Sequence, residues 1–525
     1  MLPARAHAQL GTAASCRQRP PVVPQRSSCG GGRSSRARSS RAGGWAAVRA
    51  APRRRLCCPR AVADAASASG SDGWRRVVGV AGGALLLCNA HRSVFSALLP
   101  ELAAHLQLRP SQMGEVQAAM LAAYLAGQLP AGALADRFGG LRVLLFGLAL
   151  WSAATALTAL ATAGGGLPAV YASRLLLGAA SACAMPCVSA AAAAWVPAAA
   201  RAGAVSSVYA LFNVGGVLGL ALAPQLAQSS GMAATFVAAG ALGVVWAAVA
   251  GAYLAAARAP QQQAGSPGGG GSSSGGGGGG GSGAGPEKQS AHLPRNGQLP
   301  DADGGGFELL GMRLSARGLQ QVAVLCAAHA AIGFGFFLMQ NWMPAYLASL
   351  GQQLSSAGAL SALPWLAAAL VGVVSGRAAD RRVRPPPALA PHLIRRGVPT
   401  LRVRRGFQAA SFLGCAASVL PLALAGAPSV ALAVGCLTAN LAFYSFSFGG
   451  FHAHLQDVAG PSAGVLQGLT NSCSILTGML ASLATGWLVE ATGSYSSVWL
   501  ALAALYAAGA ALWATCTTGE QLQAA

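Results

Sequence analysis

The stretch "GALADRFGGLR" (Gly132–Arg142) decides the fold of this chain, because a second version of it, "GRAADRRVR" (Gly376–Arg384), occurs in the other half of the sequence. Each version has a glycine, an aspartate four residues later, an arginine directly after the aspartate, and more arginine close behind. Long apolar runs flank both versions. A charged segment repeated between apolar runs indicates two copies of one structural unit, with the charges at a boundary with water.

The composition is that of a membrane protein. The chain has 525 residues, of which 54% are apolar and 9% charged, whereas a soluble domain has about 25% charged residues. The net charge of +22 is concentrated, with thirteen arginines in residues 1–60 and nine from Arg377 to Arg405. A nucleic-acid-binding domain carries its basic stripe on a folded, non-membrane scaffold, so we expect no nucleic-acid partner.

Apolar segments of about 20 residues, long enough to span a bilayer as helices, follow one another from Val77 onward. The sequence predicts an all-α membrane protein of twelve transmembrane helices in two six-helix halves, at residues 75–258 and 318–518. Residues 259–317 form a Gly/Ser-rich central linker, and this composition is typical of a flexible chain. The expected helices cover 76–99, 112–134, 141–163, 167–190, 203–226, 232–256, 319–349, 356–378, 406–426, 428–452, 463–488 and 494–516.

The first 70 residues are rich in Arg, Ser, Ala and Gly and nearly free of acids. This composition predicts an organelle transit peptide, the alternative being a disordered basic tail. Arginines in the connections after the second, fourth, sixth and eighth helices place the termini and the linker on one side of the membrane. These arginines are Arg137, Arg142, Arg201, Arg313, Arg317 and those from Arg377 to Arg405.

The repeated charged stretch follows the second helix of each half. Its aspartates are predicted to lie where the second and eighth helices leave the membrane, and its glycines to let helices approach closely. We interpret the stretch as a gating motif, in which each carboxylate engages an arginine or a helix N-terminus in one transport state. The motif residues are Gly132, Asp136, Arg137, Gly139, Arg142, Gly376, Asp380 and Arg381.

Two arginines lie deep in apolar segments, Arg92 in the first and Arg174 in the fourth. An arginine at the centre of a bilayer costs about 2.5–3.5 kcal/mol on insertion scales. Neither segment contains an acid to pair with it. The alternative is that each side chain extends to the membrane surface or pairs with a helix end. Unpaired guanidinium groups suit the oxygens of phosphate or carboxylate, so both are candidates for anion binding.

Other polar residues recur at helical spacing in the second, seventh, tenth and eleventh segments. For any one of them, hydrogen bonding between helices is the simpler explanation, but together they predict a polar cavity between the halves. The candidates to join the two arginines in substrate binding are Tyr124, Gln128, Tyr444 and Asn471. No arrangement of catalytic residues, metal ligands or phosphate-binding loop occurs, so we expect no enzyme, cofactor or metal.

With these features established, the sequence resembles the major facilitator superfamily, and within it the anion/cation symporter family. The resemblance covers residues 75–516 and is carried by the repeated stretch and by "NWMPAYL", "LPWLAAALVGVVSGRAAD" and "AGVLQGLTNSCSILTGML". The resemblance is strongest to plant plastid anion transporters. The family's first-helix and fourth-helix arginines, both implicated in anion binding, match Arg92 and Arg174. Its loop aspartate and second-helix Tyr and Gln match Asp136, Tyr124 and Gln128.

The sequence departs from the family pattern at three places. His91 replaces the Asp that commonly precedes the first-helix arginine, and Ser181 replaces a fourth-helix Glu linked to proton coupling. In the seventh helix, where relatives carry His-Asn-Trp or Arg-Ser-Trp, this chain has Ile332, Gly333 and Phe334. These changes bear on the coupling ion and on the substrate.

The sequence therefore predicts a secondary active transporter of an anion, inorganic phosphate, working by alternating access as a multi-pass monomer in the plastid (chloroplast) inner envelope. The alternatives are a carrier of organic anions such as ascorbate or a dicarboxylate, and a transport-dead sensor or scaffold. Arginines cannot carry protons, which leaves His91 and His329 as titratable candidates for coupling. Sodium and the proton are the candidate coupling ions, and we expect uptake to follow sodium, membrane potential or exchange rather than an inward proton gradient.

Overall fold

The computed structural model describes residues 73–256, 307–309, 312–376, 393–394, 396–459 and 463–524. The predicted transit segment at 1–70 and most of the predicted linker lie outside these residues. The described residues belong to one compact unit.

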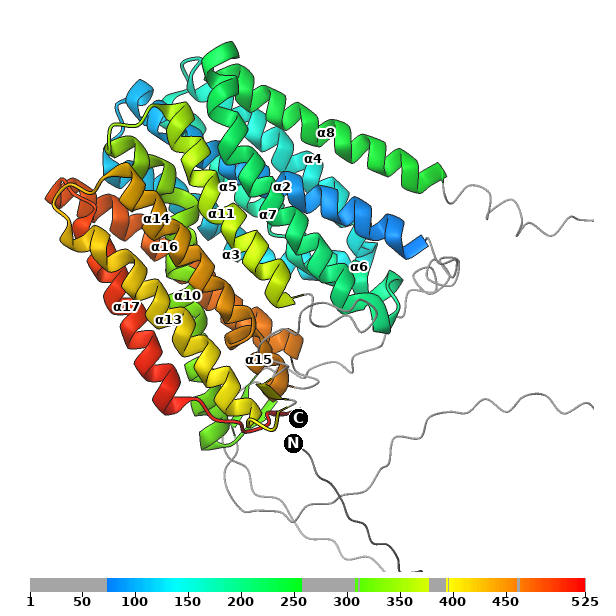
Figure 1. Cartoon of the computed structure of the whole chain (residues 1–525). Coiled ribbons are helices and arrows are strands. Elements are labelled where there is room, and N and C mark those ends of the chain that lie inside the picture. The colour runs from blue at the N-terminus through cyan, green and yellow to red at the C-terminus, as the bar shows by residue number, and fades with distance from the viewer. Residues whose placement is uncertain are drawn as a thin grey trace, which may run out of the picture. The chain divides into compact units, whose positions relative to one another are not determined.

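The first half contains six spans, two of them made of two consecutive helical pieces. Their bounds are α2 (Gly73–Leu106), α3 (Pro110–Phe138), α4 (Gly140–Leu157) with η1 (Thr158–Ala161), α5 (Gly166–Ser181) with α6 (Ala184–Trp195), α7 (Ala198–Ser230) and α8 (Met232–Ala256) (Figure 1).

The second half also contains six spans. They are α10 (Ala316–Ser349), α11 (Leu354–Gly376), α13 (Thr400–Leu424), α14 (Val430–Tyr444) with η3 (Ser445–Phe448) and α15 (Phe451–Ala459), α16 (Ala463–Thr492) and α17 (Ser496–Cys516). Among the described residues, 11 spans are long and apolar enough to cross a membrane. The remaining span is α3, and the predicted twelve-helix architecture is confirmed.

Helices are the expected outcome for these segments, because backbone groups in lipid must be satisfied within the segment itself. The first span of each half is the most enclosed, with 72% of its most apolar window buried in α2 and 67% in α10. The corresponding window of α8 is 28% buried. The polar residues of α2 and α10 therefore face protein, whereas α8 faces lipid along most of its length.

The fourth span is interrupted at corresponding positions of the two halves. In the first half α5 ends at Ser181, and α6 begins at Ala184. In the second half α14 ends at Tyr444 and passes through η3 before α15 begins at Phe451. In transporters built from repeats, interrupted helices near the membrane midplane mark binding sites, because their free backbone groups and adjoining side chains face a cavity.

A small antiparallel sheet closes one end of the second half. Strands β1 (Phe307–Leu309), β2 (Met312–Leu314) and β3 (Gln523–Ala524) pair in that order, so the residues before α10 pair with the C-terminal tail. The last residues of the predicted central linker, 259–317, therefore form two short strands and the start of α10. We call this end of the bundle, where α10 begins and α17 ends, the linker end, and the opposite end the far end.

The two halves are in contact at the far end and apart at the linker end. A Cβ on Gly114 of α3 would collide with the backbone of Ser482 in α16, and one on Gly486 with that of Pro110. Between α7 and α11, Gln228 Nε2 donates to Ser355 Oγ at 3.0 Å, also at the far end. The fold is therefore closed at the far end.

At the linker end the same two helices face open space. A Cβ on Gly132 of α3, or on Gly464 or Gly468 of α16, would meet no atom within 4 Å. The expectation that Gly132 allows close helix contact was thus wrong for this state of the molecule. The close approach occurs at Gly140, where a Cβ would lie 2.6 Å from the carbonyl oxygen of Cys187. At Gly132, Gly464 and Gly468, α3 and α16 are therefore not in contact at the linker end.

Candidate anion site

Arg92 lies midway along α2 and turns toward the interrupted fourth span. Its Nη2 donates to Ser181 Oγ at 3.2 Å, and its guanidinium carbon lies 4.7 Å from the centre of the Tyr124 ring. The side chain is buried, and its Nε has no hydrogen-bond partner among the described residues. Ser181, at the position of the family glutamate, is thus the direct neighbour of this arginine.

Arg174 is the more deeply buried of the two arginines, at 1% exposure. Its guanidinium carbon lies 4.0 Å from the centre of the Phe95 ring. The described residues show no hydrogen bond or ion pair to its guanidinium group, and its Nε is buried without a partner. Arg92 and Phe95 lie one helical turn apart on α2. This turn therefore carries one arginine and contacts the other, Arg174, through the Phe95 ring.

The two guanidinium groups are also close enough to act on one another electrostatically. Two like charges in a low-dielectric interior, without a carboxylate to balance them, are unfavourable. The two ion pairs of the described residues, Arg109–Glu490 and Arg404–Asp457, involve neither arginine. The arrangement favours a bound anion, which would supply the missing negative charge and hydrogen-bond acceptors.

Tyr124 and Gln128 lie one turn apart on α3 beside this cationic pair. The Tyr124 hydroxyl interacts with the side chains of both Arg92 and Gln128. Tyr124 is buried and Gln128 half-buried. The structure therefore brings four of the six predicted substrate-binding residues together: Arg92, Arg174, Tyr124 and Gln128.

Tyr444 belongs to an aromatic group on the second half. The Phe336 ring centre lies 5.3 Å from that of Trp365 and 5.9 Å from that of Tyr444. Phe336 also packs against the buried cluster that contains Tyr124. Tyr209 of α7, 44% exposed, lies near both Tyr124 and Tyr444. Tyr209 thus lies between Tyr124, beside Arg92, and the aromatic group of the second half.

The sixth predicted residue, Asn471, is not joined to this group by any described contact. It is half-buried on α16, and on the same helical face as the open residues Gly464 and Gly468. Among the described residues its side chain makes no hydrogen bond. Its assignment to the substrate site therefore stays a prediction.

Sequence reasoning missed Tyr209 as a neighbour of Tyr124, because aromatic residues in apolar helices give no signal of which side they face. It also missed the polar contacts that cross between the halves at mid-height. Gln340 Nε2 donates to Ser93 Oγ at 3.0 Å, and Gln117 Nε2 donates to the Asn341 carbonyl at 3.2 Å. The polar residues at helical spacing in the sequence included Gln340, Gln117 and Ser93, but the sequence did not show which of them would pair.

The two candidate coupling histidines occupy different environments. His91 points away from Arg92, toward α8, with its Nε2 3.0 Å from the carbonyl oxygen of Ala239. His329 is buried on α10, with its ring centre 4.7 Å from that of Phe451 and 5.7 Å from that of His452. Its Nδ1 has no partner among the described residues. No group of three or more potential metal ligands occurs in the described part of the chain.

Residues 332–334 of α10, where the sequence differs from the family pattern, take part in helix packing. Ile332 is buried, and a Cβ on Gly333 would collide with Ser474 of α16. The stretch is therefore part of the contact between α10 and α16.

Of the gating motif, the structure describes the first copy in part. Gly139 has a φ of 91°, which turns the chain from α3 into α4 and favours glycine. Arg137 lies over the Phe138 ring at 5.2 Å, and Arg142 is exposed. The second-copy Gly376 ends α11. The side chain of Asp136, and all of Asp380 and Arg381, lie outside the described residues.

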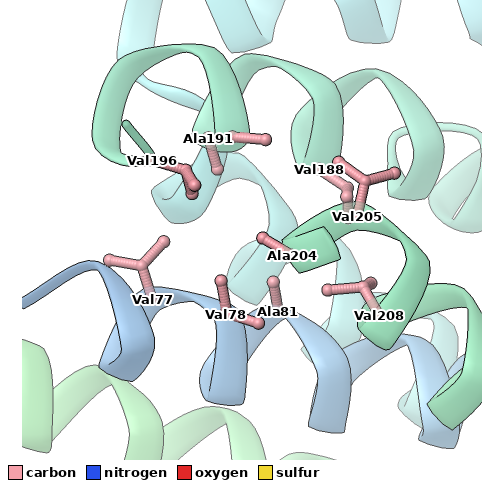
Figure 2. Close-up of a pocket in the computed structure, with 10 residues that line it drawn as sticks. Val77, Val78, Ala81, Val188, Ala191, Val196, Ala204, Val205 and Val208 are labelled. Atoms are coloured by element: carbon pink, nitrogen blue, oxygen red, sulfur yellow. The ribbon is translucent and has the colours of Figure 1, made fainter. Parts of the chain in front are cut away.

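A pocket at the linker end of the first half is apolar throughout. Figure 2 shows it between α2, α6 and α7, lined by valine and alanine side chains that include Val77, Val188 and Val208. It offers no hydrogen-bond donor or charge to an anion and is separate from the residues around Arg92 and Arg174.

Comparison with known proteins agrees with this geometry. "Probable anion transporter 3, chloroplastic" of Arabidopsis thaliana is 32% identical over 439 residues, covering 83% of this chain and 79% of that protein. "Sodium-dependent phosphate transport protein 1, chloroplastic" of the same plant is 30% identical, covering 84% and 78%. The crystal structure of a bacterial Spinster homologue in an inward-facing, occupied conformation has a TM-score of 0.59 at 15% identity, covering 85% and 97%.

The family model for the Major Facilitator Superfamily matches residues 81–474. The match includes both arginines, the first copy of the gating motif and the interrupted spans of the two halves. The expectation that the chain is a transporter fold rather than an enzyme is confirmed. The chain belongs to the Major Facilitator Superfamily.

Proposed function

We propose that this protein is a secondary active transporter of an anion, with inorganic phosphate as its substrate, and that it works by alternating access as a monomer. The observation that supports this most is the pair of buried guanidinium groups, Arg92 and Arg174, which have no carboxylate partner among the described residues. The names of the similar plant proteins, one of them a phosphate transport protein, point to the same substrate class.

In this mechanism the anion enters from the linker end and displaces the Tyr124 side chain from Arg92. Charge-assisted hydrogen bonds from the two arginines, and one from Ser181 or Tyr124, replace its hydration. The halves then rock about the site, opening the far end and closing the linker end. Because both arginines belong to the first half, the second half provides the aromatic side of the site and moves relative to the bound anion.

The test is uptake of labelled phosphate into proteoliposomes by wild type, Arg92→Gln and Arg174→Gln, with Arg402→Gln as a control. Arg402 is an exposed arginine at the start of α13. A hydrogen bond to a charged group contributes about 1.5–3 kcal/mol, so each site variant should lose at least about tenfold in uptake while the control keeps it. Strong uptake by Arg174→Gln would remove the anion-site argument. No flux of any anion by well-folded wild type would favour the transport-dead sensor.

The aromatic group of Phe336, Trp365 and Tyr444 favours a second candidate, an organic anion such as ascorbate or a dicarboxylate. Inorganic phosphate has no apolar part to place against three aromatic rings, whereas an organic anion with a ring or carbon chain does. Competition of labelled phosphate uptake by a panel of organic anions separates the two. Stronger competition by an organic anion than by phosphate would make it the substrate.

We further propose that transport is coupled to sodium, with membrane potential or exchange as the alternatives, in the plastid inner envelope. The sodium dependence and chloroplast location stated in the names of similar plant proteins support this. The absence of a carboxylate beside Arg92, where Ser181 stands, agrees with it, since a proton relay in a membrane uses a titratable group near the site.

A further inference from the structure

The contact that closes the far end contains a carboxylate from one half bound to a helix start from the other. Glu490 lies near the end of α16 in the second half. Its Oε2 accepts a hydrogen bond from the backbone N–H of Ser111 at 3.0 Å, in the first turn of α3. Its Oε1 lies 3.6 Å from Arg109 Nη1. Glu490 therefore contacts two groups of the first half at once.

The start of α3 needs such a partner. The residue before the helix is Arg109, which has no side-chain oxygen to accept from the first N–H groups. Gln112 accepts from the N–H of Arg109 itself, at 2.9 Å, and Pro110 has no N–H. The N–H of Ser111 is left for Glu490. A carboxylate at a helix N-terminus also interacts favourably with the partial positive charge there.

The contact exists only when the halves are closed at this end. Glu490, Gly486 and Ser482 are spaced by four residues and share one face of α16, and this face meets the start of α3. The backbones touch at Gly486 and at Gly114, so the helices cannot separate here without carrying the carboxylate away from Ser111. At the linker end the same two helices face open space at Gly132 and Gly468.

We propose that Glu490 is a gating residue that caps α3 across the interface of the halves and so stabilises the state open to the linker end. This rests on the proposed function only in that the protein alternates between two states. The contact would be lost in the state open to the far end, so its free energy biases the equilibrium between them. It is distinct from the gating motif, whose first copy lies at the linker end of α3.

The experiment compares hydrogen–deuterium exchange of the full chain in lipid nanodiscs, with no anion added, for wild type, Glu490→Gln and Glu490→Asp. Glu101→Gln, an exposed carboxylate near the far end of α2, is the matched control. In Glu490→Gln, exchange at residues 109–115 should rise and exchange at 132–138 and 464–470 should fall, each roughly two- to tenfold, the range for one charge at a helix terminus. Glu490→Asp should lie between wild type and Gln.

The opposite changes at the two ends are the decisive result, because a merely local cap would alter the start of α3 alone. A rise confined to residues 109–115, no change at either end, or an equal effect of Glu101→Gln would each overturn the proposal. If Glu490→Gln does not fold, Glu490→Asp is compared with wild type instead, and the same opposite changes in exchange are expected at a smaller size. Because no substrate is present, the outcome stands even if phosphate is not the transported anion.

Discussion

At the scale of single residues, the neighbour of Arg92 sets the charge of the candidate site. Ser181 Oγ lies 3.2 Å from the Arg92 Nη2 atom, at the position where the family carries a glutamate. A serine leaves the positive charge of Arg92 uncompensated, whereas a carboxylate at this distance would form an ion pair with it. The serine therefore keeps the site cationic in the absence of substrate.

Ser181→Glu should weaken anion uptake, because the new carboxylate competes with the substrate for Arg92. The interaction lost is of the order of a charged hydrogen bond, so we expect at least about a tenfold higher KM for the transported anion. Ser181→Gln, of equal size and without charge, separates crowding from electrostatics. If both variants raise KM equally, the effect is steric and the charge argument fails.

The surroundings of the histidines bear on the coupling ion at the same scale. His91 faces the Ala239 carbonyl away from Arg92, and His329 lies beside His452 in the second half. Neither imidazole is in described contact with the arginine pair. We expect phosphate uptake to continue when the pH gradient is dissipated by an ionophore at constant sodium and voltage. If uptake collapses, His329→Gln and His91→Gln will show which histidine carries the proton.

At the scale of elements, α3 has a different role at each end. Its first turn is held against α16 by Glu490, whereas a Cβ on Gly132, in its last turns, would meet no atom within 4 Å. In the state open to the far end, closing of the linker end would bring these last turns toward α16. The motif would then form its contacts in the state that this structure does not show.

Asp136→Asn tests this role of the motif. An interaction present in one state only shifts the equilibrium by about 1–3 kcal/mol and leaves the anion site intact. We therefore expect a reduced turnover number, with a much smaller change in the dissociation constant for phosphate. Turnover is measured in proteoliposomes and affinity by equilibrium binding in detergent. A variant with altered affinity and unchanged turnover would contradict the gate interpretation.

At the scale of the whole molecule, the connection between the halves has an ordered and a predicted flexible part. Residues 307–314 contribute strands β1 and β2 that pair with the C-terminal tail, and Ser315 Oγ, the N-cap of α10, donates to Glu520 Oε1 at 2.5 Å. These contacts hold the start of α10 to the end of the chain. The Gly/Ser-rich residues before them have no side chains suited to a core.

Deletion of residues 265–285 should therefore leave phosphate transport within about twofold of wild type, since a long flexible linker restricts the halves little. A matched deletion of 307–314 removes the strands and should lower the expression or melting temperature of the protein. Uptake normalised to the amount of folded transporter is the measurement. A large loss of uptake in the first deletion would show that the glycine-rich segment has a specific role.

Much of the architecture follows from the sequence alone. Twelve apolar segments, the repeated charged stretch and the glycine-rich linker predict the two six-helix halves, because the cost of exposing polar backbone in lipid depends on each segment by itself. Arg92 and Arg174 could be singled out in the same way, since a buried charge without an acid in its own segment is costly wherever the helix packs.

Only the tertiary structure decided which groups meet. It turned His91 toward α8 and Arg92 toward Ser181, and packed Phe336 against Trp365 and Tyr444. It also determined that the far end is closed, by Glu490 and the glycines of α3 and α16. The rotation of a helix in lipid and the choice between two states of similar free energy depend on packing between segments distant in sequence. Hydropathy and spacing along one segment carry no information about that packing.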